Sequence, residues 1–122
     1  MRLNRFRITK NATHILKLLK ARTGVTPNIL CRVALMTSLE QGKPSSKRPT
    51  ELDGSEFNTP TLFGEYVQIY DSFIRQVHGE IEAKQYNLIV AWHIDRGLEQ
   101  LKRCKTLLDL SQFVIAQEPQ EM

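Results

Sequence analysis

The chain has 122 residues, of which 41% are hydrophobic and 25% are charged. This composition is typical of one globular domain that buries its core without disulfides or metal ions, and it argues against intrinsic disorder. No apolar run approaches the roughly 20 residues that span a bilayer, and the first residues lack the apolar segment of a secretory signal. The sequence therefore predicts a single cytoplasmic domain that makes no membrane contact.

Positive charge is concentrated in the first part of the chain. Residues 1–50 contain eleven Lys and Arg and one acid, a net charge of +10, whereas residues 51–122 contain six Lys and Arg and twelve acids, a net charge of −6. Such a separation suggests that one part faces a polyanion while the other packs against protein. Nucleic acid is the commonest such polyanion. The alternative is a solvated basic surface that binds nothing anionic.

The first expected element is a short strand over residues 2–9. Hydrophobic and basic side chains alternate there, with Phe6 and Ile8 on one side and Arg5 and Arg7 on the other. The side that carries Phe6 also carries Arg2, so the pattern does not separate a buried face cleanly from an exposed one. It is typical of an edge strand or of a strand shared between subunits.

Two helices separated by a tight turn are expected next. The first covers residues 11–23, with an apolar side formed by Ala12, Ile15, Leu18 and Leu19, Leu16 at its edge, and an opposite basic stripe formed by Lys10, His14, Lys17 and Lys20. Gly24 ends this helix and Pro27 begins the second, which runs to residue 41. The second helix is apolar almost all round, which indicates a central place in a core or in an oligomer. Arg32 interrupts it and must pair or reach the surface.

The remainder is expected to be a loop followed by helices. Residues 43–60 are rich in Pro, Ser, Gly and charge, which predicts a long loop. A stripe of apolar side chains predicts a helix over residues 61–79. Residues 86–103 fit a buried strand or a helix, and the continuing apolar period favours a helix. A short last helix starts at Thr106, with Asp109 placed to complete a capping box.

Together these elements predict a mainly α-helical bundle with a short N-terminal β-strand, which assembles into an oligomer. The single domain divides into a basic strand-helix-helix unit (1–42), the loop (43–60), a helical remainder (61–116) and a tail (117–122). The order strand, helix, turn, helix is also that of a ribbon-helix-helix module, in which two chains pair their strands.

Three segments resemble the signature blocks of the DndE family of the bacterial DNA phosphorothioation system. They are TGVTPNILCRVALMTSL (23–39), GSEFNTPTLFGEY (54–66) and WHIDRG (92–97), and with the connecting residues the resemblance covers nearly the whole chain. The second block is the most distinctive. The third departs from the family pattern in having Asp95 where Asn is expected.

The resemblance implies a place in a multi-protein system that replaces a non-bridging phosphate oxygen of DNA with sulfur. It implies an accessory subunit that recognises nicked duplex DNA, assembles as a tetramer and works with the other proteins of the system. It does not imply a cofactor.

The residues themselves favour phosphate contact by a set of basic side chains over any catalytic chemistry. Lys and Arg clustered at this density are suited to a DNA backbone. Because most aromatic residues fall on the expected core stripe, duplex fits better than single-stranded DNA. The expected DNA-binding residues are Arg2, Arg5, Arg7, Lys10, Lys17, Lys20, Lys43, Lys47 and Arg48.

Other functions fit the sequence less well. A ribbon-helix-helix transcription regulator would read one palindromic sequence, and a DNA nickase would need carboxylates or histidines converging on a metal, for which no ligand spacing is evident. His93 is expected to be a partly buried, hydrogen-bonded histidine. Cys31 reads as a buried apolar residue and Cys104 as an exposed thiol, so neither is expected to carry sulfur. The sequence therefore predicts no catalytic residue, metal site or cofactor.

Overall fold

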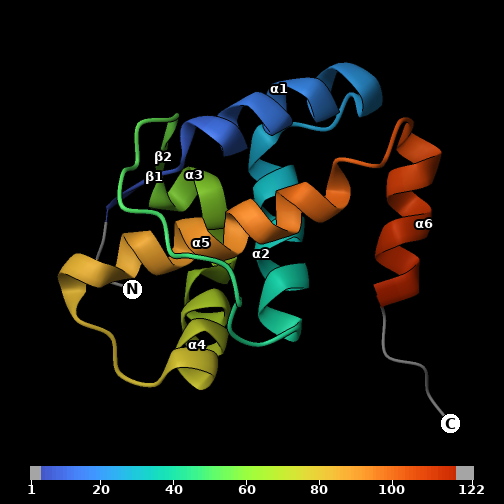
Figure 1. The fold of residues 1–122 in the computed structure, drawn as a ribbon. Helices are drawn as coiled ribbons and strands as arrows, with labels where there is room; N and C mark the ends of the chain where they lie inside the picture. Colours follow the sequence, from blue (N-terminus) through green and yellow to red (C-terminus); the bar gives the residue numbers. More distant parts are fainter. Residues whose placement is uncertain (1–3, 118–122) are drawn as a thin grey trace, which may run out of the picture.

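The computed structural model describes residues 4–117 and is mainly helical (Figure 1). Arg2 and the tail residues 118–122 lie outside the described residues. None of the described helices is long and apolar enough to cross a membrane. The elements in chain order are β1 (Arg5–Arg7), α1 (Lys10–Thr23), α2 (Pro27–Glu40), β2 (Glu56–Asn58), α3 (Thr59–Phe63), a 3₁₀ turn η1 (Gly64–Tyr66), α4 (Val67–His78), α5 (Ala83–Leu101) and α6 (Leu107–Gln117).

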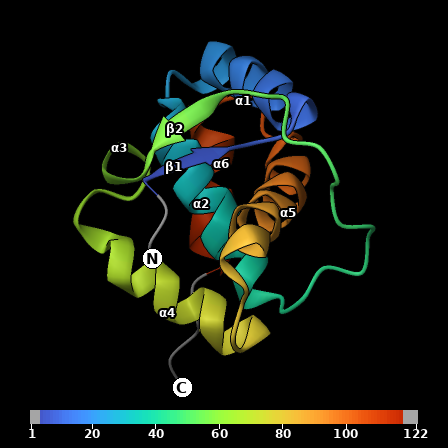
Figure 2. The same ribbon diagram turned by 90° about the vertical axis from the view of Figure 1, so that its left-hand side faces the viewer.

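Helices α2 and α5 form the centre of the molecule. In Figures 1 and 2, α5 crosses α2, with α1 on one side of the pair and α4 on the other. The crossing is close because Gly97 has no side chain: a Cβ atom there would lie 2.0 Å from the carbonyl oxygen of Ala34. The segment 86–103, which fitted a strand or a helix, is thus confirmed as a helix.

The central position of α2 explains its apolar sequence within one chain. Leu30, Ala34 and Leu35 are completely buried, in contact with neighbouring helices on several sides. The pattern that indicated either a core or an oligomer therefore reflects the core, and Leu35 is not available to a second subunit.

The N-terminal strand pairs with a segment of its own chain. β1 and β2 are antiparallel, with Phe6 opposite Phe57, and the buried Phe6 ring contacts Phe63 edge-on at 5.4 Å between centroids. Along the other edge of β1, the Asn87 carboxamide accepts from Arg7 N at 3.1 Å and donates to Arg7 O at 2.9 Å. The strand is therefore a partner of β2 and α5, and β1 is shorter than the expected 2–9.

Two expectations for residues 43–79 are wrong. Residues 43–60 do not form one loop, because β2 and the start of α3 occupy residues 56–60. The helix expected over 61–79 is broken into α3, η1 and α4. The break occurs at Gly64, whose φ of +59° is unfavourable for other residues and incompatible with a continuous helix.

Local helix signals are confirmed at the ends of α1 and α6. Gly24 adopts φ +76° and donates its N–H to Lys20 O. At the start of α6, the Thr106 hydroxyl accepts from Asp109 N at 3.1 Å, and the Asp109 carboxylate accepts from Thr106 N at 3.2 Å. This is a capping box.

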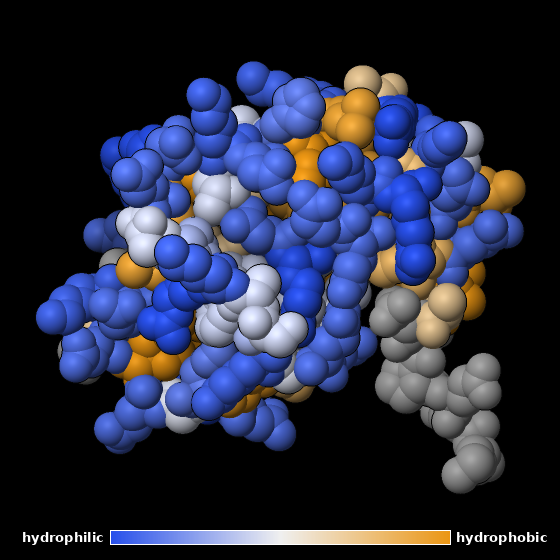
Figure 3. Space-filling view, in the orientation of Figure 1, coloured by the Kyte–Doolittle hydropathy of each residue, from blue (hydrophilic) through white to orange (hydrophobic). Residues whose placement is uncertain are grey.

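The last helix, α6, stands apart from the central helices (Figure 1). Leu110 and Phe113 are buried, but large apolar side chains on its other side are exposed, including Leu108 at 65% and Ile115 at 66%. They form part of the hydrophobic surface at the α6 end of the molecule in Figure 3. The helix thus offers an apolar face that residues 4–117 do not cover.

Candidate nucleic-acid interface

The strand arginines are exposed, but they share a carboxylate of the neighbouring strand, which offsets part of their charge. Arg5 and Arg7 lie 3.7 and 3.1 Å from the Glu56 carboxylate, and Arg7 also donates to Gly54 O at 3.0 Å. Because Glu56 lies opposite Arg7 in the antiparallel pair of β1 and β2, the ion pair between them follows from the strand register. These two residues contribute less free positive charge than the sequence suggested.

Helix α1 presents the basic stripe that its sequence predicts. Lys10, His14, Lys17 and Lys20 are all exposed, whereas Ile15 and Leu19 are completely buried. One detail differs from the expectation, because Leu16 is buried and Leu18 is only half-buried. The lysine side chains of this stripe make no ion pair within the part of the chain that the structure describes.

A second basic group lies in the loop between α2 and β2. Lys43, Lys47 and Arg48 are exposed, and no carboxylate among residues 4–117 pairs with them. The Arg48 guanidinium lies over the Trp92 ring, 5.2 Å from its centroid, and donates to Gln85 Oε1 at 3.1 Å. The indole N–H of Trp92 donates to Ser46 Oγ at 3.2 Å. The loop is therefore held against α5.

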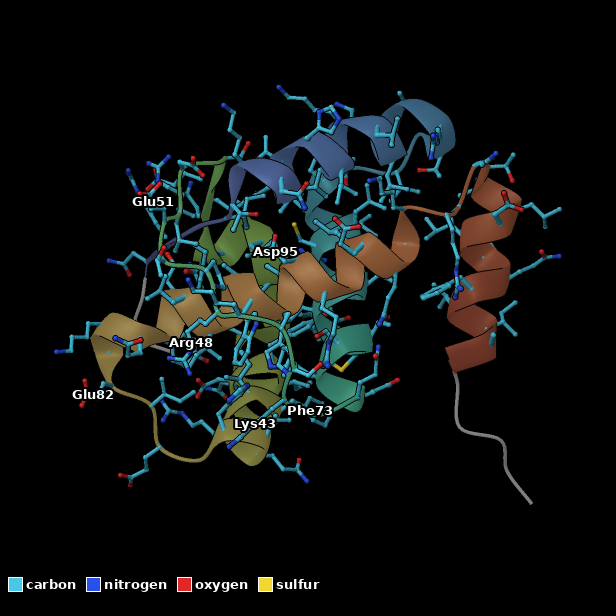
Figure 4. The ribbon with its side chains drawn as sticks, in the orientation of Figure 1. Lys43, Arg48, Glu51, Phe73, Glu82 and Asp95 are labelled. Atoms are coloured by element: carbon cyan, nitrogen blue, oxygen red, sulfur yellow. The ribbon has the colours of Figure 1, made fainter. Side chains whose placement is uncertain are left out.

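The predicted basic residues do not form one continuous group. Figure 4 places Lys43 and Arg48 on the α4 side of α5, whereas α1 lies on the opposite side. Figure 2 shows from a second direction that α1 and α4 lie on opposite sides of the molecule. The structure thus separates an α1 surface (Lys10, Lys17 and Lys20) from a loop surface (Lys43, Lys47 and Arg48). Arg5 and Arg7, which share Glu56, lie in the two-stranded sheet.

A buried polar chain connects the loop surface to the core. The Arg96 guanidinium donates to Ser38 Oγ at 2.8 Å, and Ser38 Oγ lies 2.8 Å from His93 Nδ1. His93 Nε2 lies 2.7 Å from His78 Nε2. The expectation that His93 is hydrogen-bonded is confirmed, but the residue is completely buried where partial burial was expected. The pairing with His78 was missed. No local spacing reveals this pair, because the two histidines lie on different helices, α4 and α5.

Both histidines of the pair favour the neutral form. Burial, the neighbouring His78 and Arg96 lower the pKa of His93 to about 3. Burial, Lys43 and Arg48 lower the pKa of His78 below its usual value. A neutral pair needs one N–H between the two Nε2 atoms, so one ring donates and the other accepts.

This burial predicts an acid-sensitive fold. His93 takes up a proton near pH 6.5 in the unfolded chain but only near pH 3 in the folded one, so stability is lost as the pH falls from about 6.5 towards 3. We expect the unfolding free energy to fall by about 2 kcal/mol between pH 6.5 and 5, measured by urea denaturation. His93→Gln should weaken this dependence, whereas His14→Gln, at an exposed position, should keep it. A wild-type stability that is constant over this range would contradict the assignment.

Two arginines donate hydrogen bonds to carbonyl oxygens at helix ends that are far from them in the sequence. Arg32 donates to the carbonyl oxygens of Thr61 and Leu62 at the end of α3, and it is half-buried, which confirms that it has to pair. Arg96 donates to Ser38 O and Gly42 O at the end of α2 and to Lys43 O at 3.4 Å. Cationic donors satisfy carbonyls that a helix end leaves unpaired.

Asp95 also has a structural partner. The Thr9 hydroxyl donates to Asp95 and accepts from Ala12 N at 3.0 Å, so the start of α1 is fastened to α5. Burial raises the pKa of the Asp95 carboxyl, against the opposing effect of the Thr9 hydrogen bond. Thr9 needs only an acceptor oxygen, which the side chain of Asn also supplies. Either residue at this position can therefore make the hydrogen bond with Thr9.

Neither cysteine is placed for thiolate chemistry. Cys31 and Cys104 are free and buried, and burial raises the pKa of the Cys31 thiol to about 12. The expectation of an exposed Cys104 is wrong, since the residue is 3% exposed and burial raises its pKa as well. Among the described residues, no three His, Cys, Asp or Glu lie together as a potential metal site.

These features define a small helical protein with a two-stranded antiparallel sheet and two separate basic surfaces that carry no paired carboxylate among the described residues. Residues 5–109 match the family model of the DNA sulphur modification protein DndE. The chain therefore belongs to the DndE family, which confirms the resemblance carried by the three sequence blocks. The match ends at Asp109, so most of α6 lies outside it.

Solved structures agree with this assignment. The chain is 30% identical to DndE from Escherichia coli B7A, described as involved in DNA phosphorothioation modification, with a TM-score of 0.75 over 83% of this chain and 98% of that one. It is 28% identical to a DndE G21/24K mutant, with a TM-score of 0.73 over 83% of this chain and 99% of the other. No match was found among curated protein sequences.

Proposed function

We propose that this protein is a non-enzymatic, cytoplasmic DNA-binding subunit of a DNA phosphorothioation complex, and that it binds duplex DNA with a preference for nicked duplex. The observation that carries the proposal is the presence, on a DndE-family fold, of two exposed basic surfaces without neutralising carboxylates among the described residues. Unpaired lysines and arginines on a surface attract phosphates, and their contacts carry no base specificity. Other proteins of the sulfur modification system are the proposed protein partners.

We further propose that the protein acts as a homo-oligomer, a tetramer being the expected form. Support comes from exposed apolar side chains on α4 and α6, among them Phe73, which lines a shallow hollow with Met36, Leu39 and Val77. An assembly would bring several copies of each basic surface to one DNA molecule.

The pairing of β1 with β2 of the same chain favours this proposal over the ribbon-helix-helix alternative. In that module a strand pairs with the same strand of a second chain. Here β1 pairs with β2 along one edge, and Asn87 occupies the other edge at Arg7.

The proposal predicts salt-sensitive binding that depends on DNA structure. Gel shifts with intact, nicked and single-stranded DNA of one sequence should show the tightest binding to the nicked duplex. If six or more phosphates are neutralised, affinity should fall about a thousandfold or more between 50 and 200 mM salt.

Three outcomes would count against the proposal. A flat salt titration would refute electrostatic binding, and selective binding of one palindrome would favour a transcription regulator. Cleavage of supercoiled plasmid with Mg²⁺ or Mn²⁺ would identify a nickase. Sedimentation velocity of the same sample at micromolar concentration tests the tetramer.

A further inference from the structure

The loop surface meets the end of α4 at a histidine that sequence reasoning did not include. His78 is the last residue of α4, and its ring lies 6.3 Å from the Trp92 ring between centroids. Arg48 covers the same indole. Lys43 and Arg48 are close enough to His78 to lower its pKa electrostatically, after the larger effect of burial. Arg48 and His78 thus both lie beside Trp92, and Lys43 lies near His78.

This cluster has no internal counter-charge. No carboxylate in residues 4–117 forms an ion pair with Lys43 or Arg48, whereas Arg5 and Arg7 share Glu56. Like charges held together repel one another, and an anion placed among them would remove the repulsion. The cluster therefore has an electrostatic preference for an anionic ligand that the strand arginines lack.

His78 has one ring nitrogen available to such a ligand. Its Nε2 is occupied by His93. Its Nδ1 has no hydrogen-bond partner among the described residues, and every buried polar side-chain atom there does have a partner. Nδ1 therefore reaches solvent. As the last residue of a helix, His78 also lies where the helix dipole favours a positive charge.

The loop that supplies the other cations is held in place. Ser46 accepts from the Trp92 indole, Arg48 donates to Gln85, and Lys43 O accepts from Arg96. Donors fixed in this way lose less conformational freedom when a ligand binds than donors on a free loop do.

We propose that Lys43, Arg48 and His78 form a binding site for a DNA backbone phosphate, and that His78 takes up a proton when DNA binds there. This inference rests on the proposed DNA-binding function and adds a site and a pH dependence to it. A phosphodiester is negatively charged at all relevant pH values, so it opposes the repulsion from Lys43 and Arg48 and favours the imidazolium. His93 stays neutral and accepts from the protonated His78 at Nε2, with its own proton on Nδ1, towards Ser38.

The sign of the pH effect follows from this change. DNA raises the pKa of His78 above its value in the free protein, so binding strengthens as the pH falls through the bound-state pKa. Each unit of rise strengthens the binding at low pH about tenfold for each site occupied. Lys43 and Arg48 are the charged groups that act on His78, and His78 and Arg96 act on His93.

The test is the affinity for nicked duplex, measured by fluorescence anisotropy from pH 8.0 to 5.5 at constant salt. Wild type should bind about tenfold or more tightly at the low end. His78→Gln should lose this pH dependence, and Lys43→Gln with Arg48→Gln should reduce both the affinity and the dependence. His14→Gln measures what the α1 surface adds to the pH dependence, because His14 lies on that surface. The part of the dependence that His78→Gln removes should remain in this variant.

The outcomes separate this inference from the function on which it rests. If wild type does not bind DNA, the proposed function fails. If it binds but the pH dependence is absent, or follows His14 instead of His78, the phosphate site fails and the function stands.

Direct NMR titration of His78 in the wild-type protein provides a second readout that needs no variant. Its pKa should rise on adding DNA. A rise with inorganic phosphate alone, and none with DNA, would show a site for free phosphate and overturn the proposal.

Discussion

Replacing Lys17 and Lys20 by glutamate should lower the affinity for nicked duplex by about a hundredfold or more. The double substitution replaces two attractions with two repulsions on the exposed side of α1, and every subunit of an oligomer carries it. The slope of log affinity against log salt should also fall, by about one for each phosphate that the variant no longer neutralises. The fold should persist, because changes at exposed helix positions typically alter stability by about 0.5 kcal/mol or less. Gel shifts and circular dichroism measure the two effects.

A charge change in the acidic part of the chain provides the control. Glu80→Lys with Glu82→Lys, at exposed positions before α5, should leave DNA affinity unchanged or raise it. If the variant with both α1 lysines replaced keeps its helicity and its oligomer size and binds like wild type, α1 does not face DNA. The loop surface would then carry the binding.

Gly97→Ala should destabilise the fold strongly, although it adds only one methyl group. The new methyl group would lie 2.0 Å from Ala34 O, at a contact between two backbones that no side-chain rotation relieves. Separating α2 from α5 disturbs the centre of the core, and overpacking of this kind costs about 1–3 kcal/mol or more. Intrinsic helix propensity predicts the opposite sign, a gain of up to about 1 kcal/mol. Urea denaturation decides between the two effects.

Gly24→Ala is a matched substitution without the steric conflict. No atom lies within 4 Å of a Cβ at Gly24, and its φ of +76° leaves only backbone strain, of about 1–2 kcal/mol. The Gly97 variant should therefore be the less stable of the two. The opposite order would mean that α2 and α5 do not cross as described.

Sequence reasoning succeeded where structure depends on neighbouring residues. The ends of α1 at Gly24 and of α6 at Thr106 follow from local backbone and capping preferences, and the apolar period predicts α5. The break at Gly64 was missed because a glycine within an apolar period is compatible with a helix. Only the tertiary contact of Arg32 with the carbonyls of α3 favours a break there.

The candidate site was only partly predictable for a related reason. A count of charge along the chain places Arg5 and Arg7 in the basic first part and Glu56 in the acidic second part. The pairing of β1 with β2 brings them together, so that one acid of the second part offsets part of the charge of two bases of the first. The exposure of Lys17 and Lys20 depends only on helical period and was predicted. His78 joins the loop surface through an α4–α5 contact that no sequence spacing encodes.

The ends of three helices are stabilised by residues from distant parts of the chain. Arg32 completes α3, Arg96 completes α2, and Asp95 fastens the start of α1 to α5. An isolated fragment containing α1 and α2 would lack Arg96, Asp95 and the core face of α5, and short helices without such contacts are marginal in water. Unfolding of α5 therefore exposes the ends of two other helices at the same time. We expect this arrangement to couple α1, α2 and α5 into one cooperative unit that unfolds in a single transition.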